Sequence, residues 1–451
     1  MKRINDVPYV CLFLSLFGCS GDPDNHPLSS TNTSQTPIAD DALGLTTLST
    51  SVGAAEIARR QTAVRSYFDA RVASLHAVKT TQTSSGTTID WVTPDKPQAS
   101  PPPPLKPCTQ LCAHTELQDE PAARGPAGTV PVVRFNVDAY LRSTAVPPLD
   151  PEDVLRGLRK GNGAAPPSPN AKGYYYAAWH HSATQVLGTS GVFYGGGAGL
   201  NTWVPVPAAP YLANSHSLSE LSVYGGSGSG LQSVEVGQTQ DASLNGGSTG
   251  TYLFTYYTTN DYTPPGGNNI GGYNQLVTGW HQVASDIVPG VQLYPSTTGG
   301  TQYEIEIETM QYQGNYWVWI DTEWIGYYPT SLFASSGIAN SASDIKVYGE
   351  VDDPNAPTAV ATGMGSGAFP SAGWAQAAFI RDLHYFADTN GSFVSFAAVS
   401  GDKTITDSNC YGMSAVQTDG SSGSCADTAC IYSHFFNYFY YGGPGKGGSC
   451  Q

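Results

Sequence analysis

The stretch Tyr303-Glu304-Ile305-Glu306-Ile307-Glu308 alternates strictly between apolar or aromatic and acidic side chains. Alternation with a period of two is typical of a β-strand that buries one of its faces. We therefore expect Tyr303, Ile305 and Ile307 to lie in a core, and the three glutamates to form a solvated face.

Similar short runs, separated by Gly, Asn and Ser turns, recur through the second half of the chain. The expected strands cover residues 220–224, 231–236, 251–258, 302–309, 316–322 and 344–351. Helical periodicity is almost absent after residue 173. The sequence therefore predicts an all-β fold, an antiparallel β-sandwich of the jelly-roll type over residues 173–451.

The first half of the chain has a different pattern. A helix is expected between residues 54 and 76, where five apolar residues recur at helical spacing: Ile57, Val64, Phe68, Val72 and Leu75. A second, short helix is expected over residues 151–160. Proline-rich residues 96–107 predict a stiff spacer, and the Gly/Pro-rich residues 161–173 predict an exposed linker that proteases can cut.

Arginines decorate the long expected helix, and an acidic half of the chain follows it. This arrangement suggests that residues 51–172 are a prosegment with its linker, docked by charge onto the second half. The alternative is that the arginines are simply a solvated helix face.

The N-terminus is typical of an export signal. Lys2 and Arg3 precede a short apolar stretch, residues 9–17, which is too short to span a bilayer. We assign residues 1–19 to a signal peptide and 20–50 to a disordered tether. Cys19 is positioned like the lipidated cysteine of bacterial lipoproteins, and plain secretion is the alternative. The expected location is secreted or cell-surface, as an outer-membrane lipoprotein if Cys19 is lipidated.

Six cysteines remain after the signal region. An even number in an oxidising compartment predicts disulfides, which we pair as Cys108 with Cys112, Cys425 with Cys430 and Cys410 with Cys450. Zinc binding is the alternative, but these loops lack the usual Cys/His ligand spacing. We therefore expect neither a metal nor another cofactor.

The charge is distributed unevenly. The chain carries 36 acidic and 20 basic residues, a net charge of −16, yet residues 173–451 contain only four lysines and arginines against 20 acids. Nucleic-acid binding needs a basic face, so this composition argues against it. Crowded carboxyls repel one another less once they are protonated, which suits the second half to acid.

Glu235 and Glu350 each lie within a strand-like run, 115 residues apart in the sequence. A carboxylate on a half-buried strand is costly unless it is paired or functional. Two such groups in one site form an acid/base couple. Alternation places Tyr348 on the face of Glu350, and Gly349 suits the close approach of a ligand backbone. The alternative is that both glutamates are ordinary surface residues.

Residues 173–451 closely resemble the neprosin family of secreted glutamic peptidases. The matching stretches are 235–237, 253–258, 261–262, 303–307, 314–317, 325–329, 332–333, 348–351, 364–367 and 438–445. Residues 85–92 are similar to the family's activation-peptide motif, and residues 128–134 to the segment between prosegment and enzyme. Plant members carry a cysteine pair around residues 272–274, which this chain lacks.

The resemblance implies an acid-active β-sandwich endopeptidase that cleaves after proline and is made as a zymogen. Glu235 and Glu350 match the catalytic glutamates, and Tyr348 and Gly349 are candidate substrate-binding residues. The implied partners are a proline-containing peptide and the chain's own prosegment as inhibitor, with the enzyme a monomer. Two other functions fit an aromatic-rich sandwich: a carbohydrate-binding or glycan-cleaving surface protein, and an inactive adhesion module.

Overall fold

The structure is a computed structural model. It describes residues 52–94, 102–103, 115–158, 174–182, 192–205, 215–241, 243–245, 250–352, 362–396, 402–419 and 435–445. The chain divides into two compact units, Met1–Leu48 and Ser49–Gln451, and every described residue belongs to the second. The expected signal peptide, tether and linker 161–173 lie outside the described residues, as does every cysteine except Cys410.

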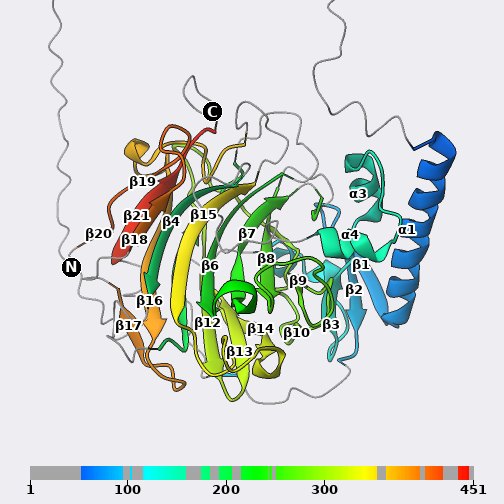
Figure 1. Ribbon diagram of the computed structural model, residues 1–451, viewed down its shortest axis with the longest axis horizontal. Helices are drawn as coiled ribbons and strands as arrows, with labels where there is room; N and C mark the ends of the chain where they lie inside the picture. The colour runs from blue at the N-terminus through cyan, green and yellow to red at the C-terminus, as the bar shows by residue number, and fades with distance from the viewer. Residues whose placement is uncertain are drawn as a thin grey trace, which may run out of the picture. The chain divides into compact units, whose positions relative to one another are not determined.

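The first part of this unit, residues 52–158, contains helices and a small antiparallel sheet in the order β1-β2-β3 (Figure 1). Its elements are α1 (Ala54–Ser74), β1 (Lys79–Gln82), β2 (Thr88–Val92), α2 (Glu116–Asp119), η2 (Pro121–Ala123), β3 (Val130–Val133), α3 (Val137–Ser143) and α4 (Glu152–Gly157). The expected helices at 54–76 and 151–160 are confirmed as α1 and α4.

The second part begins at Tyr174 and is built from two large antiparallel sheets. The eight-stranded sheet has the order β11-β8-β7-β6-β15-β4-β18, with β9 also paired to β8. Figure 1 shows β4, β15, β6, β7 and β8 side by side. The strands are β4 (Tyr174–Ser182), β6 (His216–Gly225), β7 (Gln232–Asp241), β8 (Thr251–Thr258), β9 (Gly271–Tyr273), β11 (Gln292–Leu293), β15 (Asp344–Asp352) and β18 (Asp402–Ile405).

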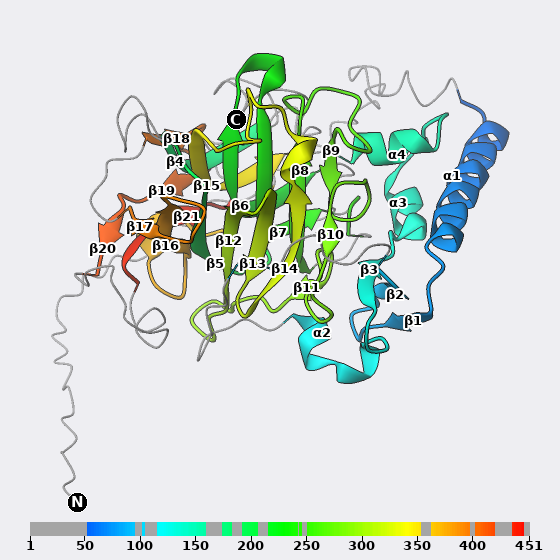
Figure 2. The ribbon, with the colours of Figure 1, turned by 90° about the horizontal axis from the view of Figure 1, so that it is seen from below.

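The ten-stranded sheet has the order β10-β14-β13-β12-β5-β16-β21-β19, with β17 paired to β16 and β20 to β21 (Figure 2). The strands are β5 (Gly195–Asn201), β10 (His281–Gln282), β12 (Glu304–Tyr312), β13 (Asn315–Ile320), β14 (Glu323–Pro329), β16 (Ala378–Phe386), β17 (Phe393–Ser395), β19 (Gly412–Met413), β20 (Gln417–Thr418) and β21 (Asn437–Gly442). The 3-10 turns of this part are η3 (Gly228–Gly230), η4 (Thr330–Leu332) and η5 (Pro370–Ala372).

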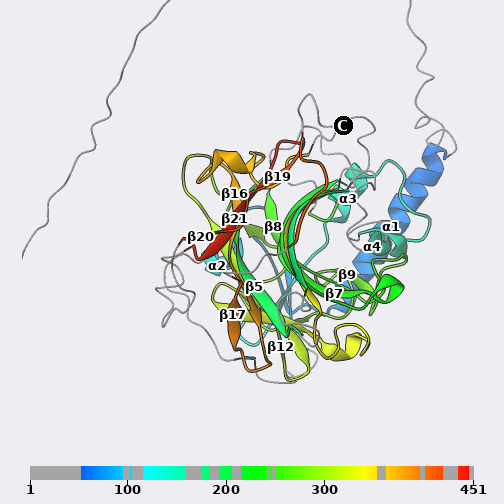
Figure 3. The same cartoon turned by 60° about the vertical axis from the view of Figure 1, so that its left-hand side comes forward.

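The main core lies between the two sheets, which are seen as separate layers in Figure 3. On β7, Val234 and Val236 enter this core, while Ser233 and Glu235 point to the opposite face. The same alternation along the other strands sends one set of side chains into this core and the other to the outer face of each sheet, where aromatic and polar groups lie together. The predicted all-β sandwich is thus confirmed, and the six expected strands lie within or overlap β6, β7, β8, β12, β13 and β15.

One expectation about β12 was wrong. Ile305 and Ile307 are in the core, but Tyr303 is 37% exposed, while the glutamates of this strand are buried rather than solvated. The reason is the glycine-rich neighbour β5. A Cβ atom at Gly197 would lie 2.4 Å from the His384 ring, so the missing side chain leaves room for buried polar groups.

Two of these buried glutamates, Glu304 and Glu308, are held by side chains of β16. Arg381 binds Glu304 with Nε 2.8 Å from Oε2, and His384 Nε2 lies 3.3 Å from Oε1 of Glu308. A buried carboxylate is tolerated when it is paired in this way. Alternation alone could not distinguish a paired buried face from a solvated one.

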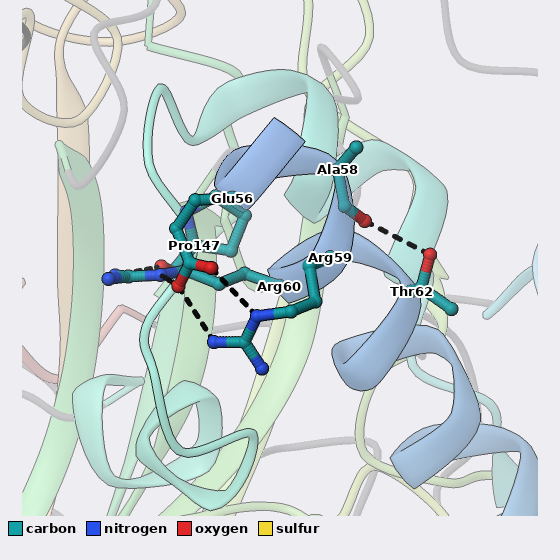
Figure 4. Close-up of polar contacts among 6 residues, drawn as sticks. All are labelled: Glu56, Ala58, Arg59, Arg60, Thr62 and Pro147. Atoms are coloured by element: carbon teal, nitrogen blue, oxygen red, sulfur yellow. Dashed lines mark hydrogen bonds and ion pairs between the residues drawn. The ribbon is translucent and has the colours of Figure 1, made fainter. Parts of the chain in front are cut away.

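Helix α1 is fixed at its start by the network in Figure 4. Glu56 accepts hydrogen bonds from Arg59 at 2.7 Å and from Arg60 at 2.9 Å, and Arg60 also donates to the carbonyl of Pro147 at 3.2 Å. The two guanidinium groups, Arg59 foremost, lower the pKa of Glu56 to about 2. The helix is thereby tied to the segment between α3 and α4.

The small sheet is organised around a buried ion pair. Asp90 on β2 is fully buried and accepts hydrogen bonds from Arg134, with Nε 2.8 Å from Oδ2, and from Thr80 at 2.7 Å. The neighbouring Trp91 packs with Ile89 and Val288. Asp90 belongs to the stretch that resembles the family's activation-peptide motif, and Arg134 to the stretch that resembles the segment between prosegment and enzyme, so one contact links both. Among the described residues, no helix is long and apolar enough to cross a membrane.

Candidate functional site

Strand β6 lies between β7 and β15 and brings the two predicted catalytic residues onto one face. Glu235 on β7 pairs with Ser222, and Glu350 on β15 pairs with Leu218. Since Ser222 and Leu218 are four residues apart on one strand, both glutamates point to the same side. In a flat sheet their Cα atoms would be about 16 Å apart.

Both glutamates are inaccessible in this state of the chain. Glu235 is 0% exposed and Glu350 is 2% exposed. Aromatic side chains dominate the cluster that covers this face, which consists of Tyr176, Ala178, Leu218, Tyr224, Leu244, Phe254, Tyr256, Tyr262, Tyr273 and Tyr348. A substrate can touch the two carboxyls only after some of this cover moves.

Glu350 is bound directly to a histidine. Nε2 of the buried His216 lies 2.8 Å from Oε1 of Glu350. Burial acts to lower the pKa of His216, but the hydrogen bond to Glu350 and the charges of Asp352 and Asp241 outweigh it, so the pKa is raised. A protonated His216 favours the ionised carboxylate of Glu350.

Glu235 is bound by hydroxyl groups instead. Ser233 Oγ donates to Oε1 of Glu235 at 2.5 Å, and the hydroxyl of Tyr262 donates to the same oxygen. Tyr262 is buried and follows β8 in the chain. Two donors on one oxygen fix the orientation of the carboxyl group.

A row of tyrosine hydroxyls connects the surroundings of Glu235 to Tyr348. The Tyr262 hydroxyl lies 3.4 Å from that of Tyr224, which lies 2.9 Å from that of Tyr348. Burial first, and then the charges of Glu220, Glu235 and Glu350 among others, raise the pKa of Tyr348 well above its usual value. Tyr348 therefore stays a neutral hydroxyl near all three carboxyls.

Gly349, between Tyr348 and Glu350 on β15, lies at a position whose side chain would point into the core between the sheets. A Cβ atom there would lie 2.6 Å from the Tyr441 ring and 2.8 Å from Sδ of Met364. Both of these side chains belong to the core between the sheets. Close core packing therefore accounts for the glycine, and the open approach for a ligand that we expected there is filled by protein.

Glu220, His216 and Tyr262 are site residues that sequence reasoning missed. Glu220 on β6 is fully buried and pairs across the sheet with Tyr348 and with Gly237. It lies in one of the expected strands, on the face opposite Leu221, so alternation could have marked it. His216 and Tyr262 lay outside every expected strand and carried no such signal.

The first part of the unit contacts the β8–β11 edge of this sheet. The side-chain amide of Gln275 donates to the carbonyl of Pro131 at 2.8 Å and accepts from the backbone N–H of Val133 at 3.4 Å. Arg71 on α1 donates to the carbonyl of Leu276 at 2.8 Å. A cavity of about 660 Å³ lies beside these contacts, lined from both parts.

Charged side chains form a second contact between the two parts. Arg124 lies 3.3 Å from Asp286. Burial, and then a hydrogen bond to Asp286, raise the pKa of Glu323 to about 8. Nearby, Oε1 of Glu116 accepts a hydrogen bond from the backbone N–H of Gln292 at 3.0 Å. Contacts that depend on carboxyl charge thus lie between the first part and the large sheets.

The cysteine predictions fall largely outside the described residues. Cys410 is buried and disulfide-bonded, but each candidate partner lies outside the described ranges. The pairing with Cys450 stays a prediction, as do the other two pairs and the lipidation of Cys19. In the part of the chain that the structure describes, no group of three or more His, Cys, Asp or Glu side chains is arranged to hold a metal ion.

The fold and the site define a class: an antiparallel β-sandwich with buried acidic groups gathered on the outer face of one sheet. A comparison with protein-family models is more specific. The family described as Neprosin matches residues 213–444. The chain therefore belongs to the Neprosin family, and this membership supports a peptidase-like function.

Proposed function

We propose that this protein is an acid-active glutamic endopeptidase that cleaves after proline. The observation that carries the proposal is the register of β7, β6 and β15, which places Glu235 and Glu350 on one face within a chain of the Neprosin family. Each carboxyl has its own fixed partners, so the two differ chemically, as an acid and a base must.

The partners suggest a division of labour. Glu350, beside protonated His216, is the ionised base: it takes a proton from a water molecule, which attacks the scissile carbonyl carbon. Glu235 is the acid, with its Oε1 accepting from Ser233 and Tyr262 while a proton on the other oxygen is given to the leaving nitrogen. The peptide C–N bond then breaks, and one water is consumed for each bond cleaved.

The distribution of ion pairs supports activity in acid. The first part is rich in ion pairs, which join Glu56 to Arg59 and Arg60, Arg65 to Asp138, Arg134 to Asp90, and Arg156 to Asp150, Glu152 and Asp153. Ion pairs of the large sheets include those of His216 with Glu350, Arg381 with Glu304 and His384 with Glu308. Acid removes carboxylate charge, so it weakens the ion pairs that hold the first part together.

Buried carboxyls of the large sheets respond in the opposite sense. Burial raises the pKa of Asp241 and Asp321, and burial with a neighbouring carboxyl raises that of Glu323. A group that holds its proton more tightly when folded contributes stability below its folded pKa and loses it as pH rises. The proposed catalytic part is thus built to be most stable in acid.

We further propose that residues 51–172 act as an inhibitory prosegment. The contacts of Arg71, Gln275 and Arg124 across the two parts support this role. Acid would loosen the prosegment and expose linker 161–173 to cleavage. Export through residues 1–19, a monomeric enzyme and a lipid anchor on Cys19 belong to the same proposal.

The aromatic cover of the site supports a preference for proline. A proline ring is apolar and packs well against aromatic faces, and Tyr256, Tyr262 and Tyr273 form such a wall, with ring centroids 4.8 to 6.0 Å apart. This wall lies beside Glu235, since Tyr256 is its direct partner on β8.

The test is cleavage of a peptide library by the acid-treated full chain and by its E235Q and E350Q variants. We expect cleavage after proline in acid and a loss of at least about a hundredfold in either variant. Full activity in either variant would remove that residue from the mechanism. Hydrolysis of glycans without proteolysis would favour the carbohydrate alternative, and no hydrolysis of either would favour an adhesion module.

A further inference from the structure

A third carboxyl lies between the two proposed catalytic residues. Glu220 is two residues along β6 from the position that pairs with Glu350, and two residues in the other direction from the position that pairs with Glu235. Its own neighbours across the sheet are Tyr348 and Gly237. The three glutamates thus follow one diagonal of one face.

The spacing makes Glu220 the central group of this diagonal. In a flat sheet its Cα atom would be about 8 Å from those of Glu235 and Glu350. A peptide bond that is attacked by water from Glu350 and protonated by Glu235 must lie between them, and therefore above Glu220. A Cβ atom at Gly237 would lie 2.8 Å from Cβ of Glu220. The glycine therefore leaves room for the side chain of Glu220.

The surroundings of Glu220 favour its uncharged form. The side chain is 0% exposed, and burial and neighbouring negative charge both disfavour ionisation. Five other carboxyls project from the described parts of β7 and β15 on this face: Glu235, Asp241, Asp344, Glu350 and Asp352. The basic groups on the described face are His216, which binds Glu350, and Lys346, whose Nζ lies 4.5 Å from the centre of the Tyr224 ring.

Neutral hydroxyls complete the environment of Glu220. Six tyrosines belong to the buried cluster on this face of the sheet: Tyr176, Tyr224, Tyr256, Tyr262, Tyr273 and Tyr348. Tyr348 is the direct partner of Glu220 across the β15–β6 ladder, so the two side chains lie next to each other on this face.

We propose that Glu220 is a third catalytic residue, whose protonated carboxyl donates a hydrogen bond to the scissile carbonyl oxygen as negative charge develops there. The proton stays on Glu220, so the role is that of an oxyanion donor and not of a transferred acid. This inference rests on the proposed function of Glu235 and Glu350. It has one direct consequence: ionisation of Glu220 destroys the donor, so activity falls as Glu220 loses its proton.

The test compares E220Q, E220A and wild type, each as acid-treated full chain, by kcat/KM on one proline-containing peptide from strong acid to neutral pH. Glutamine keeps an N–H donor that cannot ionise. We expect E220Q to stay within about tenfold of wild type in acid and to remain active at higher pH than wild type, whereas E220A loses about 10²–10³ in kcat at every pH. The matched control is E308Q, which removes another buried carboxyl on the outer face of the other sheet and should leave the pH profile unchanged.

Two results would overturn the inference while leaving the glutamate pair intact: a pH profile of E220Q that superimposes on wild type, or a loss in E220Q as deep as in E220A. If E220A does not fold, the pH dependence of kcat/KM of E220Q is by itself the test of the inference. Other carboxyls are protonated as well, so the infrared measurement is a difference spectrum, wild type minus E220Q, at mildly acid pH. A protonated-carboxyl band in this difference supports the role without any activity assay, and an ionised-carboxylate band in its place contradicts it. Failure of the proposed function is recognised separately, by full activity of E235Q or E350Q.

Discussion

Nε2 of His216 lies 2.8 Å from Oε1 of Glu350, and both side chains are almost completely buried. Because the pKa of His216 is raised above its usual 6.5, the ion pair contributes its full stability below that value and loses it as pH rises through the folded pKa. H216Q keeps a hydrogen-bond donor but not the charge. We expect it to destabilise the chain by about 1.5–3 kcal/mol in mild acid, and by less as pH rises. Urea unfolding at a series of pH values measures this, and a pH-independent difference would contradict it.

Tyr262 should orient Glu235 for catalysis. Y262F removes the hydroxyl that donates to Oε1 and leaves the ring in the aromatic wall. We expect kcat to fall about tenfold to a hundredfold with little change in KM. S233A, which removes the other donor to that oxygen, should have a non-additive effect in the double variant. Additive losses would show that the two hydroxyls act independently.

The fold of the proposed prosegment should depend on the buried ion pair between Asp90 and Arg134. D90N removes the charge that Arg134 binds at 2.8 Å, at a cost of about 3 kcal/mol to the fold of this part. Acid activation should then begin at a higher pH, while kcat/KM of the processed enzyme stays the same because the variant residue has been removed. D138N is the matched control, since its pair with Arg65 is exposed and worth at most about 1 kcal/mol. Equal activation rates for D90N and wild type would refute the role of the pair.

Asp321 should make the enzyme acid-stable at the expense of stability near neutral pH. Burial raises its pKa well above the usual 3.8, so folding favours the protonated form and stability falls as pH rises from about 4. Its Oδ1 accepts from the backbone N–H of Glu306 at 2.7 Å, and its φ of 48° suits asparagine, so D321N fits the site. We expect D321N to raise the melting temperature near neutral pH and to leave it unchanged in acid. A rise of equal size at all pH values would argue against proton linkage.

Much of the fold followed from local pattern. Period-two alternation found six strands, and helical spacing found α1, because each of these signals is contained within a few neighbouring residues. Alternation also placed Glu235 opposite the core side of Val234 and Val236, and Tyr348 on the face of Glu350, as the structure shows. The resemblance to a family then selected these two glutamates from the other acids of the chain.

The remainder depended on contacts distant in sequence. Asp90 and Arg134 are 44 residues apart, and His216 and Glu350 are 134 apart, so no local pattern could join them. The buried face of β12 was mistaken for a solvated one because the glycines that make room for it belong to β5. Glu220 had the right alternation, but its position between the two catalytic candidates depends on which strands are neighbours.

Strand β4 has a consequence for maturation. It begins at Tyr174, directly after linker 161–173, and pairs along its whole length with β15, where Tyr176 is opposite Glu350. Removal of the proposed prosegment would therefore create a new amino terminus only a few residues from the strand that positions the base. Trimming beyond Tyr174 would delete ladder hydrogen bonds beside Glu350 one by one. The cutting enzyme must stop within a narrow window, and over-trimmed molecules should be folded but progressively less active.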